Sequence, residues 1–380
     1  MKKYTILGDL ITPAKVVRCG KGNYPVLSMT MHDGIVLQSD RFKKSLASAD
    51  QSDYKVVEYG KLVIGFPIDE GVLYIQKVAP EGIMSPAYST WDVDTTRINP
   101  DFLELCLHSP QSMQYYKDKL RSTTARRRSI PTADLLALRI RTPDMESQLE
   151  AVAVARKVDE MIAIRHAQAT LLDQLVKSRF IELFGDPVSN PKDWNIEPLG
   201  KRCGIITGNT PPRSEPENYG KYIEWIKSDN INTPFTFITK AQECLSEAGF
   251  DKCRFVEAGS ILMTCIAGSI NCIGNVAVTD RRVAFNQQIN AIVPEQDEVL
   301  YLYWLMQLSK PMIHRTINMA LKGILSKSQL SEIVFPFPPI TLQEQFVAFV
   351  EQTDKSKLAV QKSLEELEIL KKSLMQQYFG

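Results

Sequence analysis

The chain has 380 residues, of which 44% are hydrophobic and 23% are charged, and its formal net charge is +1. This length can form two domains with separate cores, and no run of about 18 apolar residues is present that could span a membrane. We expect no signal peptide, because the amino-terminal residues lack an apolar stretch. Seven cysteines without a CxxC pair argue for a reducing compartment, and against a disulfide framework or a zinc site. We therefore expect a cytoplasmic protein.

Residues 1–141 have the composition of a mixed α/β domain. They are rich in Gly, Pro, Asn, Thr and aromatic residues. Short β-favouring runs at 55–57 and 61–64 alternate with turn signals such as 67–71. A helical stretch at 100–120 follows, and then a loop and a short strand. The pattern predicts one globular domain.

The end of this domain is basic. Residues 115–141 contain eight basic and two acidic side chains, a local charge of +6. Clustered Lys and Arg are what DNA phosphates require, although a near-neutral chain as a whole argues weakly against a nucleic-acid partner. A solvated charge run is the alternative interpretation. The basic residues are Lys117, Lys119, Arg121, Arg126, Arg127, Arg128, Arg139 and Arg141.

Residues 142–187 are predicted to form one long helix. Leu172, Val176, Phe180 and Leu183 fall at helical spacing, while the other faces carry charges of both signs. A helix with one narrow apolar stripe cannot bury that stripe alone, so it needs a partner helix.

Residues 188–337 repeat the texture of the first domain. A turn signal at 208–212, a β-favouring run at 275–278 and a helical stretch at 296–321 occur in the same order. The two domains resemble each other much less than the helices that follow them. We expect that they share a framework and present different surfaces.

Residues 338–380 are a second copy of 143–185, shifted by 195 positions without a gap. An internal repeat predicts a duplicated architecture. We therefore expect an α+β fold with a pseudo-two-fold repeat, in which two globular domains are separated by two long antiparallel coiled-coil helices. The matching positions are Pro143, Gln148, Val152, Ala153, Asp159, Leu172, Leu175, Lys177, Ser178, Phe184 and Gly185, which recur as Pro338, Gln343, Val347, Ala348, Asp354, Leu367, Leu370, Lys372, Ser373, Phe379 and Gly380.

Several of these segments resemble the specificity subunit of type I restriction-modification enzymes, HsdS. The helix end at 172–187 is a specific match, and so is the start of the second domain, which follows the family's pattern in order. The first domain matches more loosely, through residues 83–89 and 142–143. The matching segments of the second half are Trp194, Leu199, 206–211, 225–227, 229–231, 285–289, 336–339 and 343–345.

The resemblance implies a DNA-reading subunit. Residues 1–141 and 188–337 would be target recognition domains, each reading one half of a split site in the major groove. The helices at 142–187 and 338–380 would set the unread gap and dock two methyltransferase subunits, which flip out an adenine in each half-site. Two restriction subunits would join them. S-adenosylmethionine, ATP and Mg would then belong to those partners and not to this chain.

The sequence lacks motifs for chemistry of its own. It contains no GxxxxGK[ST] phosphate-binding loop, no HExxH zinc motif and no Asn-Pro-Pro-aromatic motif of adenine methyltransferases. We therefore predict no catalytic, cofactor-binding or metal-binding residues, and no enzyme activity in this chain.

The candidate DNA contacts lie in loops. The loop before the short strand of each domain holds the family's DNA-contacting position, and Arg, Asn, Gln, Thr and Lys can contact phosphates or base edges. Asn and Gln are also common in turns, so each candidate has a structural alternative. The candidates are Arg121, Thr123, Thr124, Arg126, Arg127, Arg128, Asn209, Thr210, Arg213, Asn286, Gln287, Lys322 and Lys327.

Two other functions remain open at this point. The near-neutral charge would also suit a protein-binding scaffold with two adaptor domains on a coiled-coil stalk. A fragment of an all-in-one restriction enzyme is a third possibility. The sequence does not give the bases read or the length of the gap.

Overall fold

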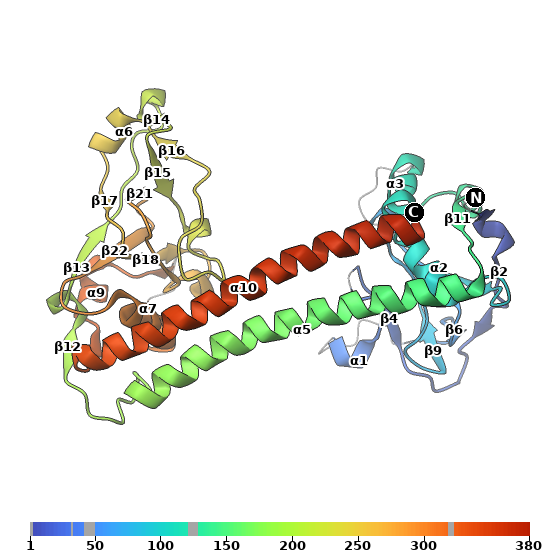
Figure 1. Cartoon of the computed structure of the whole chain (residues 1–380), viewed down its shortest axis with the longest axis horizontal. Coiled ribbons are helices and arrows are strands. Elements are labelled where there is room, and N and C mark those ends of the chain that lie inside the picture. Colours follow the sequence, from blue (N-terminus) through green and yellow to red (C-terminus); the bar gives the residue numbers. More distant parts are fainter. Residues whose placement is uncertain (1–2, 32, 42–49, 121–127, 318–322) are drawn as a thin grey trace. The chain divides into compact units, whose positions relative to one another are not determined.

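The computed structural model describes residues 3–31, 33–41, 50–120, 128–317 and 323–380 (Figure 1). The chain forms two compact units. Unit 1 comprises residues 1–167 with 361–380, and unit 2 comprises residues 168–360. The boundary crosses both long helices, so each unit contains a globular part and one end of each helix. No helix in the described part of the chain combines the length and apolar character that a membrane crossing requires.

Unit 1 is built around a four-stranded antiparallel sheet in the order β2-β10-β7-β8. All three residues of β7 are buried, and α2 packs under the sheet through Phe102 and Leu103. A three-stranded sheet, β3-β6-β9, and the pairs β4-β5 and β1-β11 complete the unit. Its elements are β1 (Tyr4–Ile6), β2 (Ile11–Pro13), β3 (Val17–Arg18), β4 (Leu27–Met29), β5 (Ile35–Leu37), α1 (Gln38–Arg41), β6 (Lys55–Glu58), β7 (Leu62–Ile64), β8 (Leu73–Ile75), β9 (Glu81–Met84), β10 (Ser89–Val93), α2 (Pro100–Leu107), α3 (Pro110–Lys119), α4 (Thr132–Leu136) and β11 (Arg139–Arg141).

Unit 2 repeats this plan with the sheet β13-β22-β18-β20. Helix α7 is buried on nearly every side from Leu300 to Met306, because it lies between this sheet and the long helices. A five-stranded sheet, β14-β16-β15-β21-β17, and the pairs β12-β24 and β19-β23 complete the unit. Its elements are β12 (Ile196–Pro198), β13 (Cys203–Thr207), β14 (Tyr219–Gly220), β15 (Ile223–Ile226), β16 (Cys244–Leu245), α6 (Glu247–Asp251), β17 (Phe255–Val256), β18 (Ile261–Thr264), β19 (Ile266–Ala267), β20 (Val276–Val278), β21 (Val283–Phe285), β22 (Ile289–Pro294), α7 (Val299–Leu308), α8 (Lys310–Arg315), β23 (Gly323–Ile324), α9 (Lys327–Glu332) and β24 (Val334–Pro336).

A buried glutamine near the start of each long helix makes two matching hydrogen bonds in both units. Gln148 accepts a hydrogen bond from the N–H of Asn99 at 2.7 Å and donates to the carbonyl of Pro143 at 2.9 Å. Gln343 accepts from the N–H of Glu298 at 2.9 Å and donates to the carbonyl of Pro338 at 3.0 Å. Both glutamines are among the residues that recur in the sequence. The pseudo-two-fold repeat predicted from the sequence is therefore confirmed, together with the α+β class.

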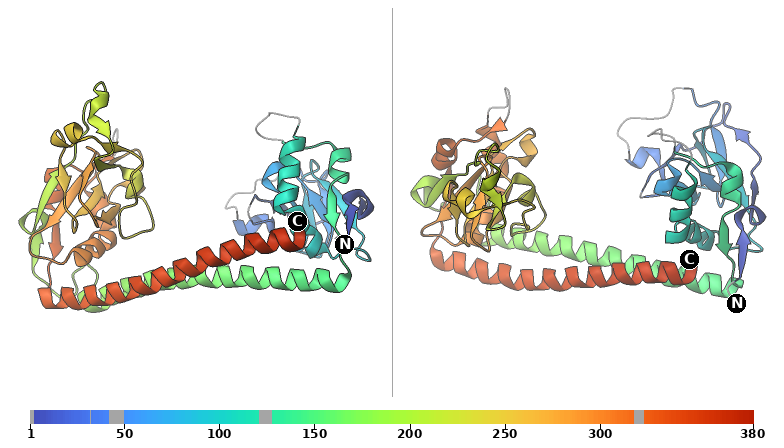
Figure 2. Two further views of the ribbon diagram at one scale, coloured as in Figure 1. Left: turned by 45° about the horizontal axis from the view of Figure 1, so that its top comes forward. Right: turned by 90° about the horizontal axis from the view of Figure 1, so that it is seen from above.

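The two long helices are α5 (Met145–Phe184) and α10 (Ile340–Phe379), each of 40 residues. They lie side by side (Figure 2). In unit 1, Lys371 pairs with Asp159 at 2.7 Å, and in unit 2, Lys357 pairs with Asp173 at 2.7 Å. Residue numbers therefore increase along α5 in the direction in which they decrease along α10. The helix pair is antiparallel, as predicted.

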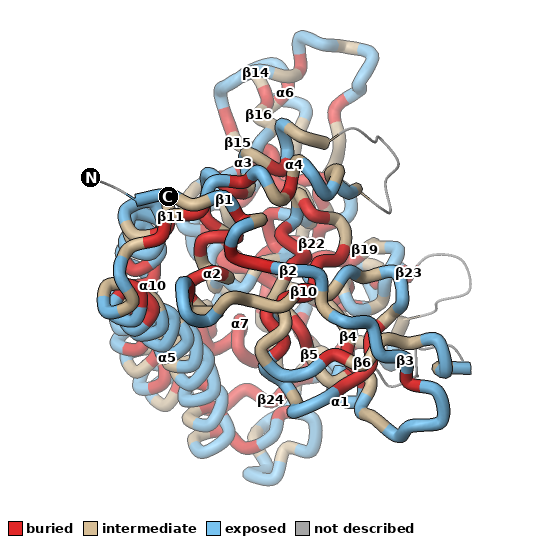
Figure 3. The backbone as a smooth tube through the Cα atoms, turned by 90° about the vertical axis from the view of Figure 1, so that its right-hand side faces the viewer, coloured by how far each residue is buried: buried red, intermediate tan, exposed pale blue. Residues whose placement is uncertain are grey.

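Each helix ends in a phenylalanine that is buried in the core of a unit. Phe184 packs edge-on against Tyr301 with ring centroids 4.9 Å apart, and Phe379 packs against Phe102 at 5.1 Å. Burying one such ring stabilises the fold by about 1.5–3 kcal/mol. Figure 3 shows buried residues gathered in strands such as β22, while α5 and α10 carry exposed residues along much of their length.

Candidate nucleic-acid interface

Three segments that the sequence marked as candidate DNA contacts lie together in unit 2. The turn after β13 meets the turn between β21 and β22, because Gly208 N–H donates to the carbonyl of Ile289 at 3.0 Å. The carbonyl of Gln288 then accepts from Cys265 N–H at 2.8 Å and from Ile266 N–H at 3.1 Å. Ile266 pairs with Ile324 of β23, the strand that precedes Lys327. Backbone hydrogen bonds therefore join residues 207–213, 286–288 and 323–327 into one surface, which we call the turn cluster of unit 2.

Gly208 is required where the first two turns meet. A Cβ atom at this position would lie 2.2 Å from the carbonyl oxygen of Asn286 and 2.4 Å from that of Phe285. Both neighbours are backbone atoms and cannot rotate away. The turns can approach this closely only because residue 208 has no side chain.

Two of the predicted contacts, Asn209 and Asn286, use their side chains to build the turns. Asn209 accepts from Arg254 N–H at 2.8 Å and donates to the carbonyl of Lys252 at 2.8 Å. Asn286 is buried, and its Oδ1 accepts from Gln288 N–H at 3.0 Å. Their geometry matches the structural alternative that the sequence left open.

Two others, Thr210 and Gln287, have side chains at the surface of the turn cluster. The hydroxyl of Thr210 donates to Oε1 of Gln287. This bond fixes the orientation of an exposed amide and leaves its NH₂ group as a donor. A fixed donor of this kind suits recognition of a base edge.

Arg213 lies in a cluster of aromatic and charged side chains beside these turns. Its guanidinium is 4.7 Å from the ring of Tyr219 and 5.2 Å from that of Trp225, and it pairs with Glu243 at 3.0 Å. Lys227 pairs with the same carboxylate at 2.7 Å. The hydrogen bond from Lys227, with a further one from Arg213, lowers the pKa of Glu243. Arg213 is 57% exposed, so its surface ion pair is worth about 1 kcal/mol or less and can be exchanged for a phosphate.

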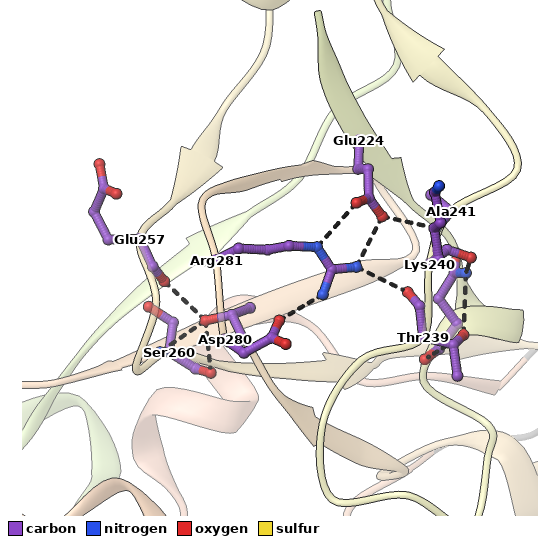
Figure 4. A network of polar contacts seen from close by, with 10 residues as sticks. Glu224, Thr239, Lys240, Ala241, Glu257, Ser260, Asp280 and Arg281 are labelled. Carbon is purple, nitrogen blue, oxygen red and sulfur yellow. Dashed lines mark hydrogen bonds and ion pairs between the residues drawn. The ribbon is translucent and has the colours of Figure 1, made fainter. Parts of the chain in front are cut away.

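A polar network supports the strand that carries Trp225. Arg281 donates to both oxygens of Glu224 at 2.9 and 2.8 Å, and also to the carbonyl of Thr239 at 3.2 Å (Figure 4). Arg281 lowers the pKa of Glu224, whose Oε2 also accepts from Ala241 N–H at 2.8 Å. The network joins β15, which carries Glu224, to Arg281 and to the segment 239–241. We assign it a structural role.

Arg128 is the one predicted contact of unit 1 that the described residues include. Its guanidinium pairs with Asp69 at 3.0 Å and with Glu70 at 2.8 Å, and its carbonyl accepts from Ile68 N–H at 2.9 Å. Arg128 therefore fastens its loop to the turn after β7. The predicted contacts Arg121, Thr123, Thr124, Arg126, Arg127 and Lys322 lie outside the described residues.

Three other described members of the basic segment also have partners within unit 1. Lys119 pairs with Asp134 at 3.6 Å, and Arg139 lies 4.8 Å from the ring centroid of Tyr4. Arg141 donates to the carbonyl of Tyr378 at 2.9 Å, where a cation stabilises the carboxyl end of α10. The local charge of the sequence therefore overstates the positive charge that these residues offer to DNA. In unit 2, Lys327 is exposed at the first position of α9.

Sequence reasoning did not single out Trp225, Lys227 or Glu243 as members of this surface. Trp225 and Lys227 belong to a motif of the family resemblance, which is the signal that could have found them. Glu243 gives no local signal, because a strand pairing brings it to Trp225. The described residues hold no group of three or more His, Cys, Asp or Glu side chains placed to bind a metal ion.

Residues 191–369 match a family described as the type I restriction modification DNA specificity domain. Over 117 residues the chain is 34% identical to the type I restriction enzyme HindI specificity subunit of Haemophilus influenzae, a match that covers 30% of this chain and 24% of that one. Over 201 residues it is 27% identical to the type I restriction enzyme MjaIX specificity subunit of Methanocaldococcus jannaschii, covering 50% and 44%. Over residues 191–369 the chain is therefore similar to the specificity subunits of type I restriction enzymes. The matched parts span less than half the length of either relative.

Solved structures show the same fold. A chain from a structure described as the basis of complex assembly and conformational transition of the type I R-M system has a TM-score of 0.63 and 17% identity, over 99% of this chain and 97% of that one. The type I restriction-modification S subunit of M. genitalium has a TM-score of 0.55 and 15% identity, over 100% and 96%. At these identities, the likeness concerns the fold alone.

Proposed function

We propose that this chain is an HsdS-type specificity subunit that reads a two-part DNA sequence for a type I restriction-modification complex, one half with each unit. The observation that carries the proposal is the repeated framework. The sheets β2-β10-β7-β8 and β13-β22-β18-β20 share one topology, yet their turns differ in sequence. Two domains that read different half-sites require a shared fold with turns of different sequence. The specificity-domain match at residues 191–369 supports DNA as the target.

The chemistry of the turn cluster in unit 2 supports base reading. Gln287 presents an amide that Thr210 orients, and a glutamine can pair bidentately with adenine. Arg213 can bind a phosphate or pair with guanine. Each good pair discriminates against a wrong base by about 1–3 kcal/mol. Arg213 and Gln287 are therefore the leading candidates for specific contacts in unit 2.

The helix pair would dock the methyltransferase subunits and set the gap between half-sites. Apolar side chains stay exposed on both helices, among them Leu171 at 62% on α5 and Leu358 at 72% on α10. Exposed apolar surface of this kind fits a protein partner. We assign two methyltransferase subunits and two ATP-dependent restriction subunits to the complex. S-adenosylmethionine, ATP and Mg would be held by those subunits, and this chain would perform no chemistry.

Docking can be tested on the helix surface. Leu171→Asp should abolish capture of a methyltransferase subunit in a pull-down while leaving the melting temperature unchanged, because the side chain is exposed in the free chain. Gln174→Asp, at an exposed site on the same helix, is the matched control. Equal capture by both variants would remove this face from the interface.

DNA reading is tested by mapping adenine methylation with single-molecule sequencing in cells that carry the chain and its partners. We expect one two-part motif with a fixed gap and one methylated adenine in each half. A motif without a gap would exclude the two-reader arrangement. If no motif depended on the chain, and the purified complex shifted no duplex in a gel, a protein-binding scaffold would be the better description.

A further inference from the structure

Equivalent sheet registers bring one basic residue of each unit to the same point of the repeated framework. Lys55 of β6 stands opposite Met84, the last residue of β9. In unit 2, Phe255 of β17 stands opposite Ala284, so the preceding residue, Arg254, comes level with Phe285, the last residue of β21. The pairing β6-β9 therefore corresponds to β17-β21. Lys55 and Arg254 are structurally equivalent.

The neighbouring strands support this equivalence. Ala14 N–H, just after β2, donates to the carbonyl of Thr90 at 3.0 Å, as Gly208 N–H, just after β13, donates to that of Ile289 at 3.0 Å. The turn after β2 in unit 1 therefore corresponds to the turn after β13 in unit 2. In the same way, the turn between β9 and β10 corresponds to the turn between β21 and β22.

Both basic side chains reach these turns. The ammonium of Lys55 donates to the carbonyl of Tyr88, between β9 and β10, at 2.5 Å. The guanidinium of Arg254 donates to the carbonyl of Thr207, at the end of β13, at 2.7 Å. Each cation is therefore held at the candidate reading surface, although the sequence offered no reason to select it.

The charges around these two residues set them apart from other cations nearby. In unit 1, Arg18 pairs with Asp53, and Lys61 pairs with Asp92 and, at 3.3 Å, with Glu58. In the portion of the chain that the structure describes, no carboxylate lies within ion-pair distance of Lys55. Burial and the adjacent Arg18 lower the pKa of Lys55, as expected for a cation that lacks a counter-charge.

The same contrast is found in unit 2. Arg282 pairs with Glu257 at 2.6 Å, and Lys252 pairs with Glu215 at 2.7 Å. Among the described residues, the guanidinium of Arg254 donates to a backbone carbonyl and pairs with no carboxylate, and the residue is exposed. A bound anion would supply the missing charge in both units.

We propose that Lys55 and Arg254 are equivalent phosphate contacts, one for each half of the DNA site. This inference rests on the proposed function. The two residues belong to the repeated framework, whereas the turns around them differ between the units. The DNA backbone is the part of the ligand that two unlike half-sites have in common, so a shared position suits a phosphate contact better than a base contact.

The test measures binding of the full chain, in complex with its methyltransferase subunits, to a duplex carrying the mapped site and to a random-sequence duplex at several salt concentrations. Lys55→Ala and Arg254→Ala should each weaken binding to both duplexes by about tenfold and reduce the slope of log affinity against log salt by about one. The double variant should lower the slope by about two. Arg254→Lys should keep the wild-type slope, because the charge remains.

Two paired cations serve as controls. Lys61→Ala and Arg282→Ala remove the same charge from sites that already have carboxylate partners, and should leave the slope unchanged. If Arg254→Ala weakened binding to the mapped site alone, with a wild-type slope, the residue would only support its turn and the proposal would be overturned. Wild-type slopes for both alanine variants would overturn it as well and leave DNA reading intact. Failure of the wild-type complex to bind either duplex would instead overturn the proposed function.

Discussion

The framework and the turns of this chain follow different rules. The framework is duplicated, with identical residues recurring at matching positions of the two long helices, and Gln148 and Gln343 hold matching backbone contacts in the two units. The turns are secured by different chemistry. In unit 2, the turn between β21 and β22 is tied to its neighbour by neutral groups, Gln287 and Thr210, while in unit 1 the equivalent turn between β9 and β10 is held by a cation, Lys55, at the carbonyl of Tyr88. The difference indicates that geometry is shared while surface chemistry is free to vary, as two unlike half-sites require.

If the framework accounts for most of the stability of the chain, removing its most buried ion pair should lower the free energy of unfolding more than the other substitutions do. Asp297 has a fully buried side chain that accepts from Arg202 at 2.9 and 2.8 Å and from Gln343 at 2.7 Å. Asp297→Ala would leave the partly buried guanidinium of Arg202 with only the more distant carboxylate of Glu197, at 4.0 Å, and should lower the free energy of unfolding by about 3–5 kcal/mol. Urea denaturation measures this loss. Asp280→Ala, which removes an exposed carboxylate, is the control and should cost less than about 1 kcal/mol; equal losses would contradict the ranking.

Adding one methyl group in the turn cluster should change the bases that unit 2 reads without changing the gap between the half-sites. Gly208→Ala would force apart the turns that carry Thr210 and Gln287, at a cost of about 1–3 kcal/mol in stability. We expect methylation mapping to show a changed or lost half-site for unit 2, with the other half-site intact. Gly268→Ala is the matched control, because its Cβ would meet no atom within 4 Å. An unaltered motif in the Gly208 variant would remove the turns from the reading surface.

Both framework glutamines should stabilise the fold, Gln343 more than Gln148, because Gln343 also donates to the buried carboxylate of Asp297 at 2.7 Å. Gln148→Leu and Gln343→Leu each leave a backbone N–H without its acceptor, which should lower the free energy of unfolding by about 1–3 kcal/mol in both units. The half-sites read should not change. Gln345→Leu, at an exposed site on α10, controls for the substitution itself. No loss for Gln148→Leu, or a smaller loss for Gln343→Leu than for Gln148→Leu, would contradict this prediction.

The ion pairs along the helices should have the smallest effect. Asp159 and Lys371 are each about half exposed, and solvent screens such pairs, so a double-mutant cycle should give a coupling of about 0.2–1 kcal/mol. The cycle is measured by urea denaturation of Asp159→Asn, Lys371→Met and the double variant. A coupling above about 2 kcal/mol would mean that charge, and not the apolar stripe, holds the helices together.

The sequence predicted the framework better than the site. The helical stripe and the repeat predicted two long helices, and α5 and α10 lie within the expected segments. The helical stretch expected at 100–120 is instead two helices, α2 and α3, separated at His108 and Ser109. Pro110, which lacks a backbone N–H, begins the second of them. Helical periodicity is a local property, and local residues determine it.

The candidate site depends on contacts between distant residues. Arg128 appeared in the sequence as part of a basic run, but Asp69 and Glu70, far upstream, neutralise it. Asn209 and Asn286 were selected for their amides, and those amides are occupied inside the turns. Lys55 and Arg254 stood out in no local pattern, because strand pairing alone brings them to Tyr88 and Thr207. Counting local charges cannot reveal which cations have partners.

The separation of framework from turns is tested most directly by shortening both helices and mapping adenine methylation. Four residues would be removed from α5 between Asp159 and Arg165, and four from the facing part of α10 between Ser363 and Lys371. This shortens each helix by about 6 Å, the length of roughly two base pairs. We predict a gap shorter by one or two base pairs between the same two half-sites. Altered half-sites with an unchanged gap would contradict the account.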